Sequence, residues 1–392
     1  MSTSSGPTVM ATAPDVAHAV AERYSAGAQA VEAALCCPVS YDPRWLQVIP
    51  QEVLDRDYGC GDPSQHLREG ETVLDLGSGG GKIAFIAAQV VGPSGRVIGV
   101  DINDEMMALA TSAAPTVAAA VGFANVEFRK GRIQDLRLDV AATEAWLAAH
   151  PVTDLASLQA FESETARQRV ESPLVPDASV DAVVSNCVLN LVATEKKAQL
   201  FAEIFRVLRS GGRAVISDIV SDVEVPARLR ADPELWSGCL SGAFQEEAFL
   251  AAFEDAGFYG VMLDKRDSTP WQVVEGIEFR AVTVVAYKGK QGPCFDHDQA
   301  VVFKGPWKSV LDDDEHVYER GVPTAVCAKT FSILQGAPYA GQFELLEPAA
   351  PVDPDTAPLF PCAVAPSLDG TGSAPLRRTV AGRSTAGDTA GA

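Results

Sequence analysis

The chain has 392 residues, of which 47% are hydrophobic and 21% charged, so it can bury a large core and form two or three domains. Its 52 acidic residues outnumber 31 basic ones and give a formal charge of -21, which would repel a phosphate backbone and excludes nucleic acid as an expected partner. No apolar run approaches the roughly 20 residues of a membrane span, and the first residues lack the pattern of a signal peptide. We therefore expect a cytoplasmic protein that does not bind membranes.

The first predicted elements are a helix and a βαβ unit. Apolar residues recur at helical spacing from Pro14 to Leu35, which predicts an N-terminal helix. From Glu71 the chain reads as a strand (TVLDL), a glycine-rich turn, a helix (KIAFIAAQVV) and a second strand (RVIGVD). This order predicts two parallel neighbouring strands.

The alternation of helices and strands continues through the middle of the chain. A helix over 104–120 is followed by a third strand (VEFRKG), a fourth (DAVVSN), a helix (KKAQLFAEIFRVLRS) and a fifth strand (GGRAVISDIV). The pattern predicts a doubly wound, mostly parallel α/β sheet whose ligands bind at the carboxyl ends of the strands. Residues 138–176, rich in Ala, Glu and Gln, predict additional helix outside the sheet.

Changes in composition predict four parts of the chain. These are an N-terminal helical extension over 1–67, the main α/β domain over 68–220, a segment with a smaller mixed α+β domain over 221–348, and a disordered tail over 349–392. The tail is assigned because large apolar residues become rare there while Pro, Ala, Gly, Ser and Thr increase.

The turn after the first strand is the first candidate site. Asp75 lies at the end of the strand, and Gly-x-Gly-x-Gly begins two residues later at Gly77. A dinucleotide fingerprint would need glycine where Lys82 stands, and a phosphate-binding Walker loop would need Ser or Thr where Ile83 stands, so both patterns fail. Asp101 ends the second strand, where a carboxylate can bind ribose hydroxyls. The combination resembles the class I S-adenosylmethionine-dependent methyltransferases and their Rossmann-like fold, more than it resembles a tight turn without a ligand.

The resemblance implies S-adenosylmethionine as methyl donor, without a metal cofactor. Gly77, Ser78 and Gly79 would then line its amino-acid part. The remaining cofactor candidates are Asp101 and Ile102 for the ribose and adenine, Met106, Ile133 and Gln134 around the purine, and Asp75 and Asn186 at the strand ends.

The eight cysteines are too few for a disulfide scaffold in a chain of this length, and in a reducing compartment they favour buried, metal-binding or catalytic thiols. Cys187 follows the fourth strand and Cys239 the fifth, so the fold should bring both to the strand ends. Cys60 precedes the first strand, and Cys36 and Cys37 follow the N-terminal helix. Each alone is typical of a core thiol, but together they favour a soft thiophilic ion.

Six segments resemble the arsenite methyltransferase family in order and spacing: ALCC at 34–37, DYGCGD at 57–62, SNCVLNL at 185–191, CLSGA at 239–243, and the C-terminal GPCFDHDQAVVFKGPW and AVCAKTF. The resemblance implies that Cys187 and Cys239 hold As(III) and that Cys60 supplies a third thiol. It further implies that Cys36 or Cys37 pairs with Cys60 in a disulfide relay. One departure is Gly238, where the family usually has Glu.

The resemblance also implies the partners and the roles of the predicted parts. The substrate would be arsenite or an arsenic-glutathione conjugate, and thioredoxin or glutathione would be the reductant. Residues 1–67 would carry the relay cysteines, 68–220 would bind the methyl donor, and 221–348 would contain the last arsenic ligand.

Two other classes of function remain open from the sequence. The chain could methylate an organic small molecule with its cysteines merely packed, or it could be a non-catalytic thiol-based metalloid or zinc protein. No Cys-x-x-Cys pair or His cluster favours zinc. Cys294, Cys327 and Cys362 are interpreted as structural or incidental, because nothing in their spacing ties them to the methyl donor.

Overall fold

The structure, a computed structural model, describes residues 13–30, 32 and 39–362. The described residues form two compact units, which meet in the chain between Lys288 and Gly289. Cys36 and Cys37 lie outside the described residues, as does the chain from residue 363 onward.

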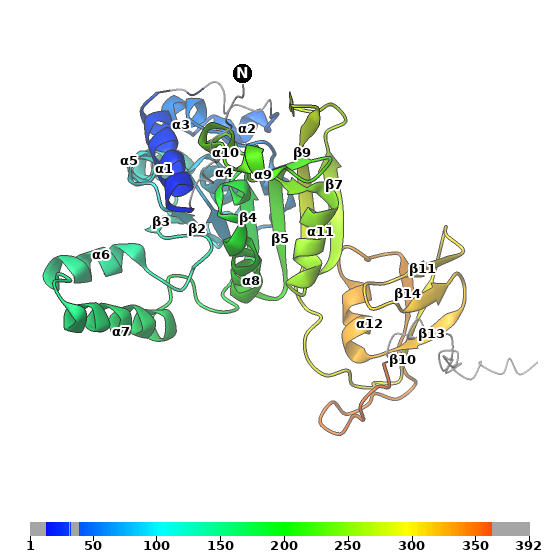
Figure 1. Cartoon of the computed structure of the whole chain (residues 1–392). Coiled ribbons are helices and arrows are strands. Elements are labelled where there is room, and N and C mark those ends of the chain that lie inside the picture. Colours follow the sequence, from blue (N-terminus) through cyan, green and yellow to red (C-terminus); the bar gives the residue numbers. More distant parts are fainter. Residues whose placement is uncertain (1–12, 31, 33–38, 363–392) are drawn as a thin grey trace, which may run out of the picture. The chain divides into compact units, whose positions relative to one another are not determined.

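The first unit is built on one sheet (Figure 1). Its main path has the order β3-β2-β1-β4-β5-β9-β7, while β6 pairs with β5 and β8 with β9. Strands β1 to β5 are parallel, and β9 runs antiparallel between β5 and β7. The strands are β1 Thr72–Leu76, β2 Arg96–Asp101, β3 Val126–Lys130, β4 Val180–Asn186, β5 Leu208–Ser221, β6 Phe244–Gln245, β7 Tyr259–Arg266, β8 Gln272–Val274 and β9 Ile277–Tyr287.

The helices of this unit are α1 Ala13–Gln29, α2 Pro43–Leu46, α3 Gln51–Asp55, α4 Lys82–Val91, α5 Asp104–Val121, α6 Val140–Ala149, α7 Leu155–Glu171, α8 Lys197–Val207, α9 Ala227–Arg230, α10 Pro233–Ser237 and α11 Glu246–Asp255. Short 3-10 turns cover Pro63–His66, Leu189–Leu191 and Thr194–Lys196. The Asn103 side chain caps α5 by accepting from the Met106 N–H at 3.0 Å. Gly122, at φ 87°, ends the helix.

The core of this unit explains why its strands read as apolar runs. Val73, Leu74 and Leu76 of β1 and Val183 of β4 are fully buried, as expected for central parallel strands that are covered on both faces. The predicted doubly wound, mostly parallel sheet with a smaller mixed C-terminal domain is confirmed.

Two predicted boundaries differ in the structure. The helix expected to run to Ser210 ends at Val207, and β5 begins at Leu208. Residues 221–288 belong to the first unit rather than to a C-terminal domain, because β9 pairs along β5 from Tyr287 to Phe279. Helices α6 and α7 are the additional helices expected in 138–176 (Figure 1), and Thr143 Oγ1 of α6 lies 3.0 Å from Gln168 Oε1 of α7.

As far as residue 362, the second unit has a three-stranded antiparallel sheet of order β13-β10-β14, a hairpin β11-β12 and the helix α12. Its elements are β10 Gln299–Phe303, β11 Ser309–Leu311, β12 Val317–Glu319, β13 Pro323–Val326, α12 Ala328–Gln335 and β14 Phe343–Leu346. Residues 349–362, expected to be disordered, are ordered by pairing: the Asp296 N–H donates to Pro358 O at 2.8 Å. Among the described residues, no helix is long and apolar enough to cross a bilayer.

Candidate active site

The glycine turn joins β1 to α4 at the carboxyl edge of the sheet. Gly77 and Gly79 have φ of +66° and +49°, in the left-handed region that favours glycine. A Cβ on Gly77 would lie 2.3 Å from a Val188 methyl carbon, whereas the nearest atom to a Cβ on Gly79 is Met106 Sδ at 4.0 Å. The space beside the Gly79 backbone, on the side where a Cβ would point, is therefore open as far as Met106, and a ligand could approach there.

Asp101 is fixed at the end of β2 by backbone donors. Its Oδ2 accepts from the Gly79 N–H at 2.9 Å and its Oδ1 from the Asn103 N–H at 2.8 Å. Burial raises the pKa of Asp101, against the effect of these hydrogen bonds. Each carboxylate oxygen has a second lone pair, so the group can still accept from ribose hydroxyls. Ile102, the neighbouring candidate, is 46% exposed.

Two buried polar atoms beside the turn lack a protein partner among the described residues: Asp75 Oδ2 and Ser78 Oγ. Such groups are rare in folded proteins and call for a ligand or water. Burial raises the pKa of Asp75 to about 8, with Asp101 and Asp57 adding to the effect. Asp75 is thus mostly protonated at neutral pH. These unpartnered atoms and the open backbone at Gly79 fit a small polar cofactor.

The candidates for the purine side are buried or half-buried. Met106 of α5 is 2% exposed and packs with Ala28 and Tyr58. Ile133 is buried in the main core after β3, and Gln134 next to it is half-buried. These residues follow β2 and β3, at the same edge of the sheet as the glycine turn.

Cys187 and Cys239 are brought together at the ends of β4 and β5. Cys187 directly follows β4, and its N–H donates to Ser217 O of β5 at 2.8 Å. The Cys239 thiol donates to Cys187 O at 3.3 Å. Both cysteines are buried, and both have positive φ, 63° and 62°. Such backbone strain in residues other than glycine is uncommon and gathers at functional sites.

Cys60 joins the same buried cluster through Asn186, the last residue of β4. The Asn186 Oδ1 accepts from the Cys60 N–H at 2.9 Å and the Gly61 N–H at 3.0 Å. Its Nδ2 donates to Gly61 O at 2.8 Å and to Tyr41 Oη at 3.2 Å. The amide of Asn186, which was predicted at the cofactor, holds the Cys60 loop in this structure.

Helix α1 packs beside α5 and α10 and places a tyrosine at the thiols, which the sequence analysis missed. Tyr24 Oη lies 3.6 Å from Cys239 Sγ. Burial, and then the neighbouring Cys239, raise the pKa of Tyr24, so its hydroxyl stays protonated. Arg23 holds α1 to α10 by donating to Glu234 O at 3.0 Å. A Cβ at Gly238, the position that departs from the family pattern, would lie 3.4 Å from Arg23 Nη1.

A buried aspartate supports the loop after Cys187. Asp218 Oδ2 accepts from the Leu189 N–H at 2.9 Å and Oδ1 from Asn190 Nδ2 at 2.8 Å. Burial raises the pKa of Asp218 to about 6 and lowers that of Lys197 to about 8. Sequence reasoning missed both, although a charged residue inside the apolar strand GGRAVISDIV was a signal for Asp218.

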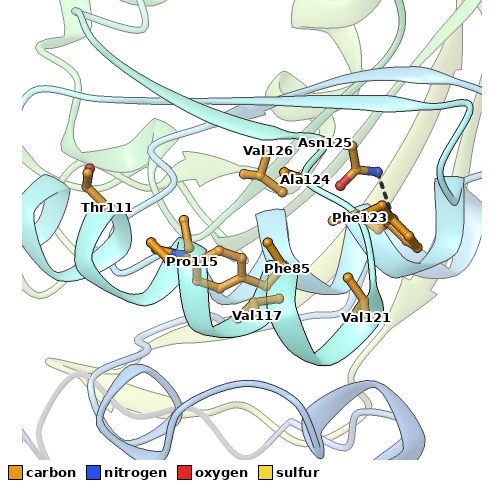
Figure 2. Close-up of a pocket in the computed structure, with 12 residues that line it drawn as sticks. Phe85, Thr111, Pro115, Val117, Val121, Phe123, Ala124, Asn125 and Val126 are labelled. Atoms are coloured by element: carbon orange, nitrogen blue, oxygen red, sulfur yellow. Dashed lines mark hydrogen bonds between the residues drawn. The ribbon is translucent and has the colours of Figure 1, made fainter.

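A separate apolar cavity of about 350 Å³ lies between α4, α5 and the start of β3 (Figure 2). Phe85, Pro115, Val117 and Val121 line it, and Asn125 bonds to Ala88 O at its rim. Since Asn125 precedes β3, the cavity lies at the amino end of that strand. It is therefore not the predicted cofactor site, which lies at the carboxyl ends.

The methyltransferase-domain family matches residues 67–156 and 158–257, and a domain of unknown function matches 290–369. An arsenite methyltransferase of Aquipseudomonas alcaligenes is 33% identical over 328 residues, 79% of this chain and 84% of that protein. An arsenite methyltransferase of Homo sapiens is 28% identical over 76% of this chain and 73% of that protein.

The crystal structure of an arsenic(III) S-adenosylmethionine methyltransferase from Chlamydomonas reinhardtii is similar, with a TM-score of 0.54 and 26% identity. The alignment covers 81% of this chain and 99% of that one. The chain therefore belongs to the arsenite methyltransferase family and is an S-adenosylmethionine-dependent methyltransferase.

Proposed function

We propose that this enzyme methylates trivalent arsenic, supplied as arsenite or a thiol conjugate of it, while cysteine sulfurs hold the metalloid. The observation that carries the proposal is the contact of Cys239 with Cys187, with both residues in strained backbone at the strand ends. Two soft sulfur donors at this edge of the sheet suit a thiophilic ion better than an organic oxygen or nitrogen acceptor. The names of the relatives support the same substrate.

The cofactor side of the proposal uses the glycine turn and the end of β2. S-adenosylmethionine supplies an electrophilic methyl group on a positively charged sulfur. The backbone at Gly77 and Gly79 would bind its amino-acid part together with the unpartnered Ser78 Oγ and Asp75 Oδ2. Asp101 would accept from the ribose hydroxyls, and Ile102, Met106, Ile133 and Gln134 would border the adenine.

The thiols provide both binding and orientation. Cys187, Cys239 and Cys60 replace the oxygen ligands of arsenite, and the bound As(III) keeps a lone pair. Holding that lone pair in line with the methyl group makes the displacement effectively intramolecular, which can lower the barrier by several kcal/mol. Arsenic attacks through its lone pair and loses no proton, so the step requires no general base.

The relay follows from electron balance. Formation of the carbon-arsenic bond raises arsenic formally from the trivalent to the pentavalent state, and two electrons return it to the trivalent state. Two thiols supply them by forming one disulfide. We assign this pair to Cys60 with Cys36 or Cys37, and its reset to an external thiol reductant, thioredoxin or glutathione. Cys36 and Cys37 lie outside the described residues.

The test compares two substrates, arsenite and a trivalent monomethyl arsenical, by chromatographic speciation of the products. Cys187→Ser should abolish methylation of both, because a hydroxyl is a hard and poor ligand for As(III). Cys60→Ser should cripple the first methylation but retain much of the second, since a monomethyl species needs only two protein sulfurs to complete its three bonds.

Each contrary outcome removes a definite part of the proposal. Equal losses on both substrates for Cys60→Ser would make Cys60 a ligand throughout, and full activity on arsenite would remove it from the relay. If the reduced enzyme bound no arsenite at all, the substrate assignment would fail in favour of an organic acceptor.

A further inference from the structure

A second group of thiols lies in the C-terminal unit. Cys294, Cys327 and Cys362 place their sulfur atoms within 4.8 Å of one another. Cys327 is buried and the other two are half-buried, so the group is reachable from solvent. The sequence analysis interpreted these cysteines as structural or incidental, because nothing in their spacing tied them to the methyl donor. The structure instead brings them to one point.

Backbone hydrogen bonds hold the three segments together. The Phe360 N–H donates to Cys294 O at 2.8 Å, which fixes the Cys362 segment against the Cys294 segment. The Ala328 N–H donates to Phe295 O at 2.9 Å, which fixes the start of α12 beside them. Folding therefore already includes the entropic cost of closing the loops between Cys294, Cys327 and Cys362, and the thiols are preorganised for a ligand.

The surroundings of the group favour thiolate at Cys294. Cys327 caps α12, and its sulfur accepts from the Thr330 N–H at 3.4 Å. Burial opposes ionisation of Cys294, but hydrogen bonds with Cys362 and Cys327, and the nearby Lys329, lower its pKa. Burial and the hydrogen bond to Cys294 raise the pKa of Cys362 to about 12. A helix N-terminus and a lysine are features of reactive or ligating cysteines.

We propose that Cys294, Cys327 and Cys362 form a trithiolate site for a trivalent metalloid ion, distinct from the thiols of the methyltransfer site. The ligand atoms gathered here within the described residues are three sulfurs, with no imidazole or carboxylate among them. Trivalent arsenic needs three bonds and keeps a lone pair, whereas structural zinc takes four protein ligands. Soft sulfur donors select a soft ion.

Loading the site is a ligand exchange without oxidation or reduction. Arsenite, As(OH)₃, exchanges three hydroxyls for three sulfurs, and the three thiol protons leave with them as three water molecules. The choice of arsenic over another thiophilic metalloid rests on the proposed function. The site itself rests on the C-terminal unit alone, which matches a domain of unknown function.

The test is equilibrium dialysis of the full-length reduced protein against arsenite, with bound arsenic counted by elemental analysis. We expect two tight equivalents for the parent chain. One should remain in Cys362→Ser, because loss of one of three donors should weaken binding by more than the roughly 10–100-fold that follows loss of an outer-shell contact. Cys362 is half-buried near the end of the described chain, so this change should leave the fold intact, and unfolding curves check that.

A complementary variant isolates the proposed site. Serine replaces every other cysteine: Cys36, Cys37, Cys60, Cys187 and Cys239. This variant should retain one equivalent, with three arsenic-sulfur bonds by X-ray absorption. Two tight equivalents in Cys362→Ser would overturn the site, and preferential binding of zinc that arsenite cannot displace would overturn the metalloid assignment. If the five-serine variant instead bound as much arsenic as the parent, the proposed function would fail and this site would stand.

Discussion

Replacing Asn186 with Ala tests how the Cys60 loop is held. The change removes the acceptor of the Cys60 and Gly61 N–H groups, both buried. An unsatisfied buried donor costs about 1–3 kcal/mol. Because water can enter the half-buried space left by the amide, we expect about 1 kcal/mol for each of the two N–H groups, or about 2 kcal/mol together. Gly61 O keeps the Tyr41 hydroxyl as donor at 3.0 Å. A loss of about 2 kcal/mol at the positioned thiol corresponds to a roughly 30-fold slower first methylation.

The assay pairs arsenite turnover with calorimetric S-adenosylmethionine affinity. We expect the rate to fall while the cofactor affinity changes less than about twofold, since the amide contacts the Cys60 loop. Asn125→Ala is the matched control, because the Asn125 amide also holds backbone groups, donating to Ala88 O and Gly92 O at the far end of the sheet. It should lower stability without a selective loss of arsenite turnover. A loss of cofactor affinity as large as the loss of rate would refute this reasoning and would indicate that Asn186 contacts the cofactor, as the sequence predicted.

Three further changes probe the site. Asp101→Ala should lower S-adenosylmethionine affinity and leave the fold intact; calorimetry decides, and unchanged affinity would remove Asp101 from the site. Tyr24→Phe removes the hydroxyl 3.6 Å from Cys239 Sγ but keeps the ring packing on Tyr58. Arsenite affinity, measured by dialysis, should fall severalfold, and equal affinity would show that this contact does not contribute to arsenite binding. Burial raises the pKa of Asp75 from 3.8 to about 8, so between those pH values the folded state binds more protons than the unfolded state and loses stability as pH rises. Asp75→Asn should flatten the dependence of the unfolding free energy on pH, measured by urea unfolding from pH 5 to 8. Equal pH dependence in parent and variant would contradict the shift.

Local patterns in the sequence carried the fold and the glycine turn. Short runs of apolar residues between turn residues mark the strands, and Gly-x-Gly-x-Gly after an acidic strand end marks the turn at Gly77 and Gly79. The position of a cysteine after a parallel strand also predicted correctly that Cys187 and Cys239 meet. These inferences succeeded because each depends on neighbours in the chain or on one rule of sheet topology.

Contacts between irregular segments could not be predicted in this way. Tyr24 meets Cys239 across 215 residues, and Asn186 meets Cys60 across 126. No periodicity links such residues, because helix orientation and loop packing bring them together. The meeting of the three C-terminal cysteines could not be predicted for the same reason, since it depends on the pairing of a segment that composition alone had predicted as disordered.

The different anchoring of the active-site thiols has a kinetic consequence under the proposed function. The backbone N–H groups of Cys187 and Cys239 donate to Ser217 O and Trp236 O, whereas the Cys60 loop is joined to β4 through the side chain of Asn186. Two of the three proposed arsenic ligands, Cys187 and Cys239, are thus held rigidly, and the third, Cys60, is held less rigidly. Stepwise exchange with soluble thiols should therefore begin at Cys60. The arsenic bond to Cys60 should break first, and the bonds to Cys187 and Cys239 should break last, when the product leaves.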